Sequence, residues 1–269
     1  MDGLRLTSPV ALLTALVVTA GTTLCCAWRW SLVAQRLGVA VPVRTAVAAY
    51  YRSQFLNATL PGGVLGDVHR GMSHGRQTGE LSRGLRSVAW DRAIGQGVQA
   101  VLALGAVALL LSAVRPQALV VALVGPAVLV LVLATLPRRA RLVLVEDGRL
   151  LSTIWPRAAL ASALAAVGHV VVFVIAARTA GVTIPLLELA ALALVVLLAS
   201  AVPVGVAGWG PREGAAAWVF GAVGLGAAQG VTVAVVYGVM ALFATMPGVV
   251  VAVRRSEAVR APELGSAHG

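Results

Sequence analysis

The chain has 269 residues, of which 59% are strongly hydrophobic and only 12% are charged, about half the charged share that is usual in soluble domains. A soluble fold of this length cannot hide so much apolar surface, so the composition predicts an all-α, polytopic helical membrane protein. The net charge is +11, and all 21 basic residues are arginine. Without lysine the chain cannot hold a GxxxxGK[ST] P-loop, a pyridoxal-phosphate Schiff base or a lysine nucleophile, which excludes ATP-driven pumping by this chain alone.

Apolar stretches that approach the roughly 20 residues needed to cross a bilayer occur about eight times. We expect membrane segments near residues 8–28, 45–65, 88–112, 117–136, 158–180, 185–203, 213–228 and 230–253. Together they form one integral membrane domain over residues 1–256, with half-repeats at about 1–136 and 137–256, and residues 257–269 form a disordered tail. Tryptophans near the segment boundaries are expected at the membrane interface: Trp28, Trp30, Trp90 and Trp155.

The placement of the arginines predicts the orientation. Arginines cluster in the connections 70–86 and 137–157 and in the tail after residue 253. Because arginine is enriched in cytoplasmic loops, all three regions are expected to face the cytoplasm, which places the C-terminus there and the chain in the cell membrane. The N-terminus lies inside if segment 45–65 crosses fully, and outside if that segment is re-entrant.

A ten-residue pattern, P-x-G-x-x-G-x-x-x-R, occurs twice at a distance of 142 residues. The first copy runs from Pro61 to Arg70, the second from Pro203 to Arg212, and each ends an apolar run. Proline and glycine interrupt a helix, and broken backbone within a membrane survives only inside protein or beside a wet cavity. Interrupted segments at corresponding positions of two halves point to a transporter's binding site, so we expect membrane hairpins that turn at the motif. The alternative is a surface turn whose arginine reaches the headgroups.

The residues of the motif favour an anion. Backbone N–H groups at a restarting helix attract negative charge, and the arginine that ends each motif can hold a phosphate or carboxylate in two hydrogen bonds. A polar stripe follows on the third segment, where Arg92, Gln96 and Gln99 must face the bundle or a cavity. We expect the neighbouring acids to hold the arginines until an anion arrives, or to make ordinary local pairs and helix-start contacts: Asp67, Asp91 and Glu213.

The remaining polar candidates are histidines and tyrosines. His169 lies halfway along the fifth segment, where it could hydrogen-bond within the bundle or relay a proton. His69 and His74 are expected in a loop, and Tyr50 and Tyr237 are expected to pack. No group of His, Cys, Asp and Glu has the spacing of a metal site, so neither a metal nor a cofactor is expected.

The two motifs and the triplet Trp90-Asp91-Arg92 resemble the lysylphosphatidylglycerol synthase transmembrane-region family, from about Trp28 to Arg255. That family forms the membrane part of bacterial multiple peptide resistance factors, and it also occurs as stand-alone proteins and fused to glycosyltransferases. The stretches that carry the resemblance are Phe55-Leu56-Asn57, Pro61-Gly62-Gly63, Gly66-Asp67, Arg70, Asp91-Arg92, Pro203 through Gly208, Gly210 and Arg212-Glu213-Gly214.

Two features depart from the family pattern. Gly238 follows Tyr237, where family members commonly have an arginine. The resemblance also covers the membrane region of the full synthase and not its aminoacyl-transferase domain, so we do not expect lysyl transfer from it.

The resemblance implies that an anionic or aminoacylated lipid headgroup moves between leaflets, and we expect a flippase-like translocator of a phospholipid or polyprenyl phosphate rather than an enzyme. Its headgroup site is expected to comprise Asn57, Pro61, Gly62, Gly63, Gly66, Asp67, Arg70, Asp91, Arg92, Pro203, Gly205, Gly208, Gly210, Arg212 and Glu213. Two alternatives stay open. One is a membrane-embedded enzyme acting on a lipid-linked phosphate, with His69 or His74 as base or nucleophile. The other is a non-transporting partner of a separately encoded glycosyltransferase or aminoacyl-transferase. No nucleic-acid partner is expected.

Overall fold

The computed structural model describes residues 9–109, 137–200, 210–249 and 251. This part of the chain is helical and contains no strand, which confirms the expected all-α class. The helices are α1 (Pro9–Arg36), α2 (Val43–Thr59), α3 (Leu65–Thr78), α4 (Leu81–Leu109), α6 (Arg138–Leu151), α7 (Trp155–Thr179), α8 (Leu186–Ala199), α9 (Pro211–Ala222) and α10 (Ala227–Thr245), with a short 3-10 helix, η2 (Ser152–Ile154), between α6 and α7.

Most of the expected membrane segments coincide with helices. Helices α1, α4, α7 and α10 overlap the segments expected at 8–28, 88–112, 158–180 and 230–253. Within the described residues, three helical stretches are long and apolar enough to cross a bilayer, namely Pro9–Arg36, Arg138–Thr179 and Ala227–Val249. The segment expected at 117–136 and the tail 257–269 lie outside the described residues.

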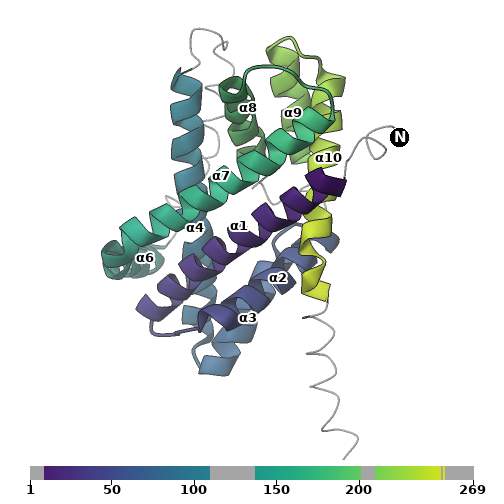
Figure 1. Cartoon of the computed structure of the whole chain (residues 1–269). Coiled ribbons are helices and arrows are strands. Elements are labelled where there is room, and N and C mark those ends of the chain that lie inside the picture. The colour runs from purple at the N-terminus through teal and green to yellow at the C-terminus, as the bar shows by residue number, and fades with distance from the viewer. Residues whose placement is uncertain (1–8, 110–136, 201–209, 250, 252–269) are drawn as a thin grey trace, which may run out of the picture.

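The helices that flank the two motifs are short. Helices α2, α3, α8 and α9 have 17, 14, 14 and 12 residues, which at 1.5 Å per residue makes them roughly 26, 21, 21 and 18 Å long. A single helix of that length does not cross a hydrocarbon core of about 30 Å. Helices α2 and α3 pack as a hairpin, and so do α8 and α9; in each pair the second helix runs back to the end of the bundle at which the first begins (Figure 1).

The two halves of the bundle repeat the same set of helix contacts. Helix α1 packs along α7, and the contacts of α1 with α2 and α4 recur as contacts of α7 with α8 and α10. Between the halves, α1 contacts α10 and α7 contacts α4, while α10 contacts α2 and α4 contacts α8. Each contact thus has a counterpart when helices α1–α4 are exchanged with α7–α10, as a two-fold relation between the halves requires.

The direction of the helices shows that this repeat is inverted. Helices α1 and α7 lie side by side and run in opposite directions, and α4 and α10 also run in opposite directions (Figure 1). The α2–α3 hairpin enters from one end of the bundle and the α8–α9 hairpin from the other. Inverted repeats of this kind are related by an axis in the membrane plane. The sequence left the choice between inverted and parallel repeats open, because its arginine bias fits both.

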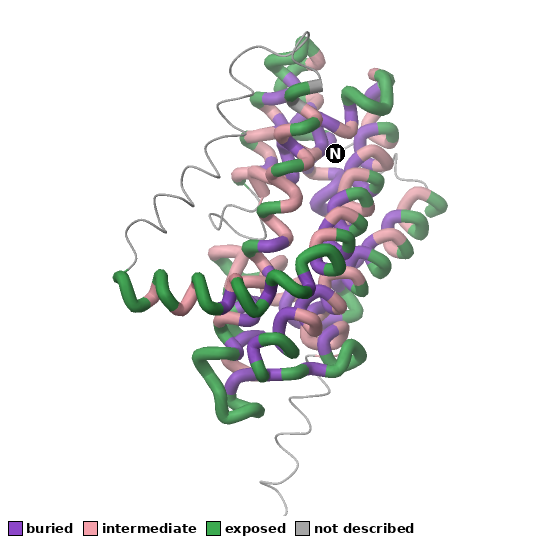
Figure 2. Tube along the Cα trace, turned by 90° about the vertical axis from the view of Figure 1, so that its left-hand side faces the viewer, coloured by how far each residue is buried: buried purple, intermediate pink, exposed green. Residues whose placement is uncertain are grey.

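Apolar side chains fill the interior of each half, while the outer faces of the helices are exposed (Figure 2). Phe173, Leu189 and Phe220 belong to the apolar cluster of the second half. Trp30 belongs to that of the first half, where it is buried and donates a hydrogen bond to Ser87 Oγ at 3.0 Å. Its expected place at the membrane interface is therefore wrong.

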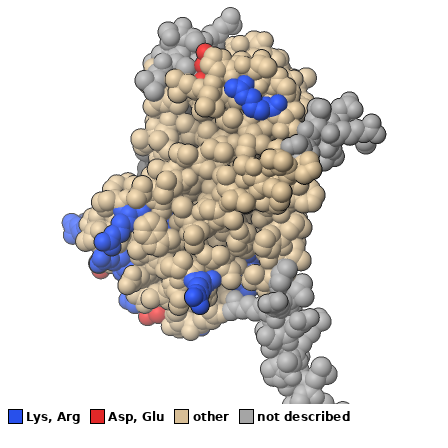
Figure 3. Space-filling model, in the orientation of Figure 1, with Lys and Arg blue, Asp and Glu red and all other residues tan. Residues whose placement is uncertain are grey.

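One face of the molecule shows where the described charges lie. In Figure 3 the arginine and acidic side chains lie toward the two ends of the molecule, and the surface between them carries none. An uncharged middle surface is what contact with lipid tails requires.

The central crossing of α1 and α7 depends on a glycine. A Cβ atom at Gly168 would lie 2.3 Å from Cγ2 of Thr22, and the Thr22 hydroxyl is held by a 2.8 Å hydrogen bond to the carbonyl of Thr19. Small residues at such crossings let the backbones of membrane helices approach each other.

We expect Gly168→Ala to lower the stability by about 1–3 kcal/mol, because the added methyl group overpacks this crossing. The measurement is the melting temperature of the detergent-solubilised protein. In the control, Gly97→Ala on α4, nothing lies within 4 Å of the new methyl group, so its melting temperature should not fall. Adding Thr22→Ser to Gly168→Ala removes the opposing methyl group and should restore the loss; a double variant as unstable as Gly168→Ala would refute this explanation.

Candidate functional site at the meeting point of the hairpins

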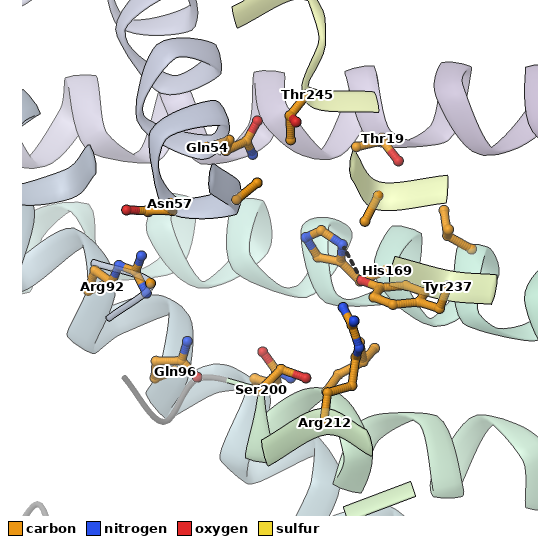
Figure 4. A pocket seen from close by; sticks show the side chains of 16 residues that line it. Thr19, Gln54, Asn57, Arg92, Gln96, His169, Ser200, Arg212, Tyr237 and Thr245 are labelled. Carbon is orange, nitrogen blue, oxygen red and sulfur yellow. Dashed lines mark hydrogen bonds between the residues drawn. The ribbon is translucent and has the colours of Figure 1, made fainter. Parts of the chain in front are cut away.

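A cavity of about 320 Å³ lies between the first hairpin and the helix ends of the second, where α8 ends and α9 begins (Figure 4). Asn57 and Gly63 line it from the first hairpin, and Ser200 and Arg212 line it from the second. The other lining residues are Thr19, Gln54, Ala58, Arg92, Gln96, Gln99, His169, Val172, Leu197, Tyr237, Ala241 and Thr245. The cavity therefore lies at the interface of the inverted repeats.

The polar stripe of α4 faces this cavity. Arg92, Gln96 and Gln99 all line it, as their spacing along one face of a helix predicted. The side chain of Arg92 is partly exposed, and Oε1 of Gln96 is buried with no hydrogen-bond partner in the part of the chain that is described. Arg92 and Gln96 thus offer polar atoms to whatever occupies the cavity.

A buried network of charges, centred on Asp91, lies beside the cavity. Asp91 is 0% exposed, and its Oδ1 accepts a 2.7 Å hydrogen bond from Nε of Arg29. Its Oδ2 accepts from Nη2 of Arg70 at 3.1 Å and from the hydroxyl of Tyr50. Arg29 also donates through Nη1 to Ser162 Oγ at 2.9 Å, so the network reaches α7 of the second half.

Asp67 connects this network to the cavity. Its Oδ1 accepts from Nη2 of Arg70 at 3.0 Å, and its Oδ2 accepts from Nδ2 of Asn57 at 2.8 Å and from Nη2 of Arg92. Asn57 Oδ1 in turn accepts from the backbone N–H of Gly66 at 2.8 Å. The hairpin is therefore closed by Asn57 on α2, which joins both Asp67 and the backbone of α3.

Glycines make the turn of this hairpin possible. Gly62 and Gly63 have φ values of 84° and 61°, the left-handed region that glycine adopts without strain. A Cβ atom at Gly66 would lie 2.1 Å from the carbonyl oxygen of Ser53, so α3 can pack this closely on α2 only with glycine there. The turn that Pro61 begins thus brings Asp67 next to α2.

Arg70 lies behind Asp67 and does not line the cavity. It is 2% exposed, and its guanidinium lies 3.9 Å from the centre of the Tyr50 ring and 4.5 Å from that of Trp30. Its Nε and Nη1 have no hydrogen-bond partner among the described residues, so the two aromatic faces take the place of polar partners.

The network carries a surplus of positive charge. It contains Arg29, Arg70 and Arg92 against Asp67 and Asp91, which leaves one positive charge. Of these three arginines, only Arg92 lines the cavity. Charges interact more strongly in a site of low dielectric constant than in water, so this surplus favours an anion in the cavity.

The second hairpin contributes Arg212, beside an acid that compensates it. Nε and Nη2 of Arg212 donate to Oε1 of Glu213 at 3.0 and 2.7 Å, and Oε2 of Glu213 accepts from the N–H of Gly210 at 2.6 Å. Glu213 therefore pairs with Arg212 and also accepts a hydrogen bond from the N–H group at the start of α9. The guanidinium lies 5.6 Å from the centre of the Tyr237 ring, and the Tyr237 hydroxyl lies 3.4 Å from Nδ1 of His169 (Figure 4).

The space that Arg212 occupies exists because residue 238 is glycine. A Cβ atom at Gly238 would lie 2.3 Å from Nη2 of Arg212. The departure from the family pattern at this position therefore has a structural consequence, since a larger residue would displace the arginine.

The two histidines of the enzyme hypothesis lie away from the cavity. Both are on α3, so their expected placement in a loop is wrong. His74 is buried with Nε2 2.6 Å from the carbonyl oxygen of Val39, and His69 is exposed. His169 does line the cavity, and its Nδ1 lies 3.4 Å from the Tyr237 hydroxyl, which agrees with a hydrogen bond within the bundle.

The expected site residues thus fall into distinct places. Asn57, Gly63, Arg92 and Arg212 line the cavity, whereas Asp67, Arg70 and Asp91 form the network behind it. The turn of the first hairpin holds Pro61 and Gly62, Gly66 lies in the first turn of α3, and the start of α9 holds Gly210 and Glu213. Pro203, Gly205 and Gly208 lie outside the described residues.

Sequence reasoning missed Arg29, Trp30 and Tyr50, and it assigned Tyr237 to packing alone. Arg29 had a signal, because an arginine inside an apolar helix of 28 residues is by default a functional candidate. The aromatic residues had none, since ordinary packing in a membrane helix gives the same sequence pattern.

The fold and the cavity define a helical membrane protein built from inverted repeats, with a polar site at the repeat interface. The chain belongs to the lysylphosphatidylglycerol synthase TM region family, whose family model matches residues 2–248. Comparison with curated proteins and with solved structures gives no match. Membership of this family makes the chain a membrane protein with a lipid-related function.

We expect Asp91→Asn to destabilise the protein by about 3–5 kcal/mol, because the change leaves Arg29 and Arg70 buried without their shared carboxylate. The measurement is the melting temperature in detergent. The control is Glu80→Gln, which also removes one acid but breaks only the exposed Arg83–Glu80 pair, worth at most about 1 kcal/mol. Equal losses in the two variants would contradict a special role for Asp91.

Proposed function

We propose that the protein moves an anionic lipid headgroup between the two leaflets of the cell membrane. The observation that carries this proposal is the cavity at the meeting point of the hairpins, where Arg92 and Arg212 from opposite halves face the same space. The surplus positive charge of the network supports an anionic ligand, and the family supports a lipid. A phospholipid and a polyprenyl phosphate both present the phosphate group that these arginines can bind.

The proposal gives the arginines different roles. Arg92 and Arg212 bind the phosphate, while Asp67 and Glu213 hold them when the cavity is empty. Arg70 is a positioning residue in this scheme, because it orients Asp67 from behind and does not face the cavity. Arg29 and Asp91 likewise hold the network in place.

The cavity lowers the cost of carrying a charged group through hydrocarbon, which is prohibitive for an unpaired ion. The headgroup would pass through the polar space while the acyl chains stay in the lipid. Hairpins that enter from opposite ends suit this task, because each one separates the cavity from one side of the membrane. In the absence of an ATP site, the movement is downhill or driven by a potential or an ion gradient.

The proposed orientation places the arginine-rich end of the bundle in the cytoplasm. Helix α6 and the connection from α3 to α4 lie at this end, and α10 ends there (Figure 1). The α2–α3 hairpin begins and ends at this same end, so α1, the helix before it, finishes there. Helix α1 therefore begins at the opposite end, outside the cell. The C-terminus follows α10 on the cytoplasmic side.

The alternatives differ from translocation in their observable products. The positions of His69 and His74 give no support to an enzyme that uses either of them at the cavity. A non-transporting partner of a glycosyltransferase or aminoacyl-transferase would leave lipid movement at the level of empty vesicles, even for the unaltered protein.

We expect Arg92→Gln and Arg212→Gln each to slow translocation at least tenfold, since a hydrogen bond to a charged group is worth about 1.5–3 kcal/mol. The assay uses proteoliposomes that hold phosphatidylglycerol with a fluorescent acyl chain, and dithionite measures how fast the probe becomes accessible. The control is Arg36→Gln, which removes the same charge at an exposed position away from the cavity and should leave the rate unchanged. Unaltered translocation in the double variant Arg92→Gln/Arg212→Gln would overturn the proposed mechanism.

We expect Gly238→Ala to slow translocation as well, because its methyl group would displace Arg212 without removing any charge. The same vesicle assay measures the rate, and the melting temperature checks that the fold is retained. Gly214→Ala on α9 is the matched control, since its methyl group would meet nothing within 4 Å. A normal rate in Gly238→Ala would show that the position of Arg212 over Tyr237 does not matter.

A further inference from the structure

Helix α6 extends sideways from the bundle at the arginine-rich end (Figure 2). Its main helix contacts are with η2 and α1, and Figure 2 shows it exposed along most of its length. With 14 residues, α6 is by itself too short to cross a hydrocarbon core of about 30 Å, and it lies across the direction of α4 and α10. This is the placement of an interfacial helix rather than of a membrane-spanning one.

The outward face of α6 combines apolar and basic side chains. Leu142 and Val145, 61% and 54% exposed, are three residues apart and so lie on one face of the helix. Leu150 and, just past the end of α6, Trp155 are about half exposed as well. The exposed arginines around them are Arg138, Arg139, Arg141, Arg149 and Arg157, against one exposed acid, Glu146.

The opposite face of α6 is fixed to the bundle by a buried acid. Asp147 accepts hydrogen bonds at 3.1 Å from Nη1 of Arg86 and from Nε1 of Trp90, both on α4. Gly148 packs beside the same tryptophan, 3.9 Å from its ring to the site of a Cβ atom. The contacts of Asp147 determine which face of α6 points outward. One of its partners, Trp90, directly precedes Asp91 on α4.

We propose that the outward face of α6, together with Trp155 and Arg157 at the start of α7, is a binding surface for anionic lipids of the adjacent leaflet. Leu142 and Val145 insert among the acyl chains, and the arginines bind lipid phosphates at the level of the headgroups. A lipid surface fits both kinds of side chain, because acyl chains cover the exposed apolar residues and anionic headgroups attract the arginines beside them. This surface is separate from the cavity, so the proposal does not depend on translocation.

The test compares the full chain in nanodiscs of phosphatidylcholine alone with nanodiscs that also contain phosphatidylglycerol. Hydrogen–deuterium exchange of the α6 amides is the readout. We expect exchange to slow on the order of tenfold in the anionic nanodiscs, since each basic residue near an anionic surface adds to its attraction. The difference between the two kinds of nanodisc should shrink at high salt, which screens charges at the surface.

Variants distinguish an effect of the α6 surface on lipid binding from an effect of the protein's net charge. Arg138→Gln/Arg139→Gln/Arg149→Gln should abolish most of the response to phosphatidylglycerol. The matched control Arg36→Gln/Arg44→Gln/Arg76→Gln removes three exposed arginines elsewhere on the chain and should keep it. Leu142→Ser/Val145→Ser should raise α6 exchange in both kinds of nanodisc. Exchange that is independent of lipid charge, or a control triple as defective as the α6 triple, would overturn the proposal.

Discussion

Asp91 imposes the constraint on which the first half of the structure depends. A carboxylate with no exposed surface is tolerated inside a membrane domain only when its lone pairs are fully used, and Asp91 uses them on Arg29, Arg70 and Tyr50. Those three residues come from α1, α3 and α2, so satisfying one carboxylate brings three helices against α4. The next residue, Arg92, points about 100° away around the helix and reaches the cavity. Neighbouring residues of α4 thus have two functions: Asp91 holds the first hairpin in place through Arg70, and Arg92 lines the cavity.

The two halves share a fold but differ in their charges. The two motifs share the four fixed positions of one pattern, yet α3 begins four residues after Pro61, while α9 begins eight residues after Pro203. Arg70 is therefore the sixth residue of its helix and is sealed beneath aromatic rings, whereas Arg212 is the second residue of its helix and faces the cavity. The acid beside Arg212 is its direct neighbour, Glu213, and compensates it locally. An inverted repeat of the fold has thus produced one supporting arginine and one arginine placed to bind.

The sequence predicted those features that depend on local periodicity. Apolar length placed the helices, and the spacing of Arg92, Gln96 and Gln99 put them on one face, which the cavity confirms. The role of Arg29 was not predictable in this way, because it depends on α1 crossing α4 and α7, and no local pattern encodes a crossing. Trp30 was misplaced for the same reason, since its position near the end of an apolar run fits an interfacial or a buried ring equally well. The inverted relation of the halves required helix directions, which arginine counts alone do not give.

Gly238 shows how the cavity differs from the pattern that the family resemblance implies. The resemblance implies an arginine directly after the tyrosine of the last helix, at the position of Gly238. Here the glycine brings no cation and leaves room for Arg212, which reaches over from α9 and is already paired with Glu213. Among the described residues, the surplus positive charge at the cavity therefore comes from the Asp91 network alone and amounts to one. Under the proposed function a phosphodiester, with its single negative charge, balances that surplus, whereas a more highly charged headgroup would require the Arg212–Glu213 pair to open.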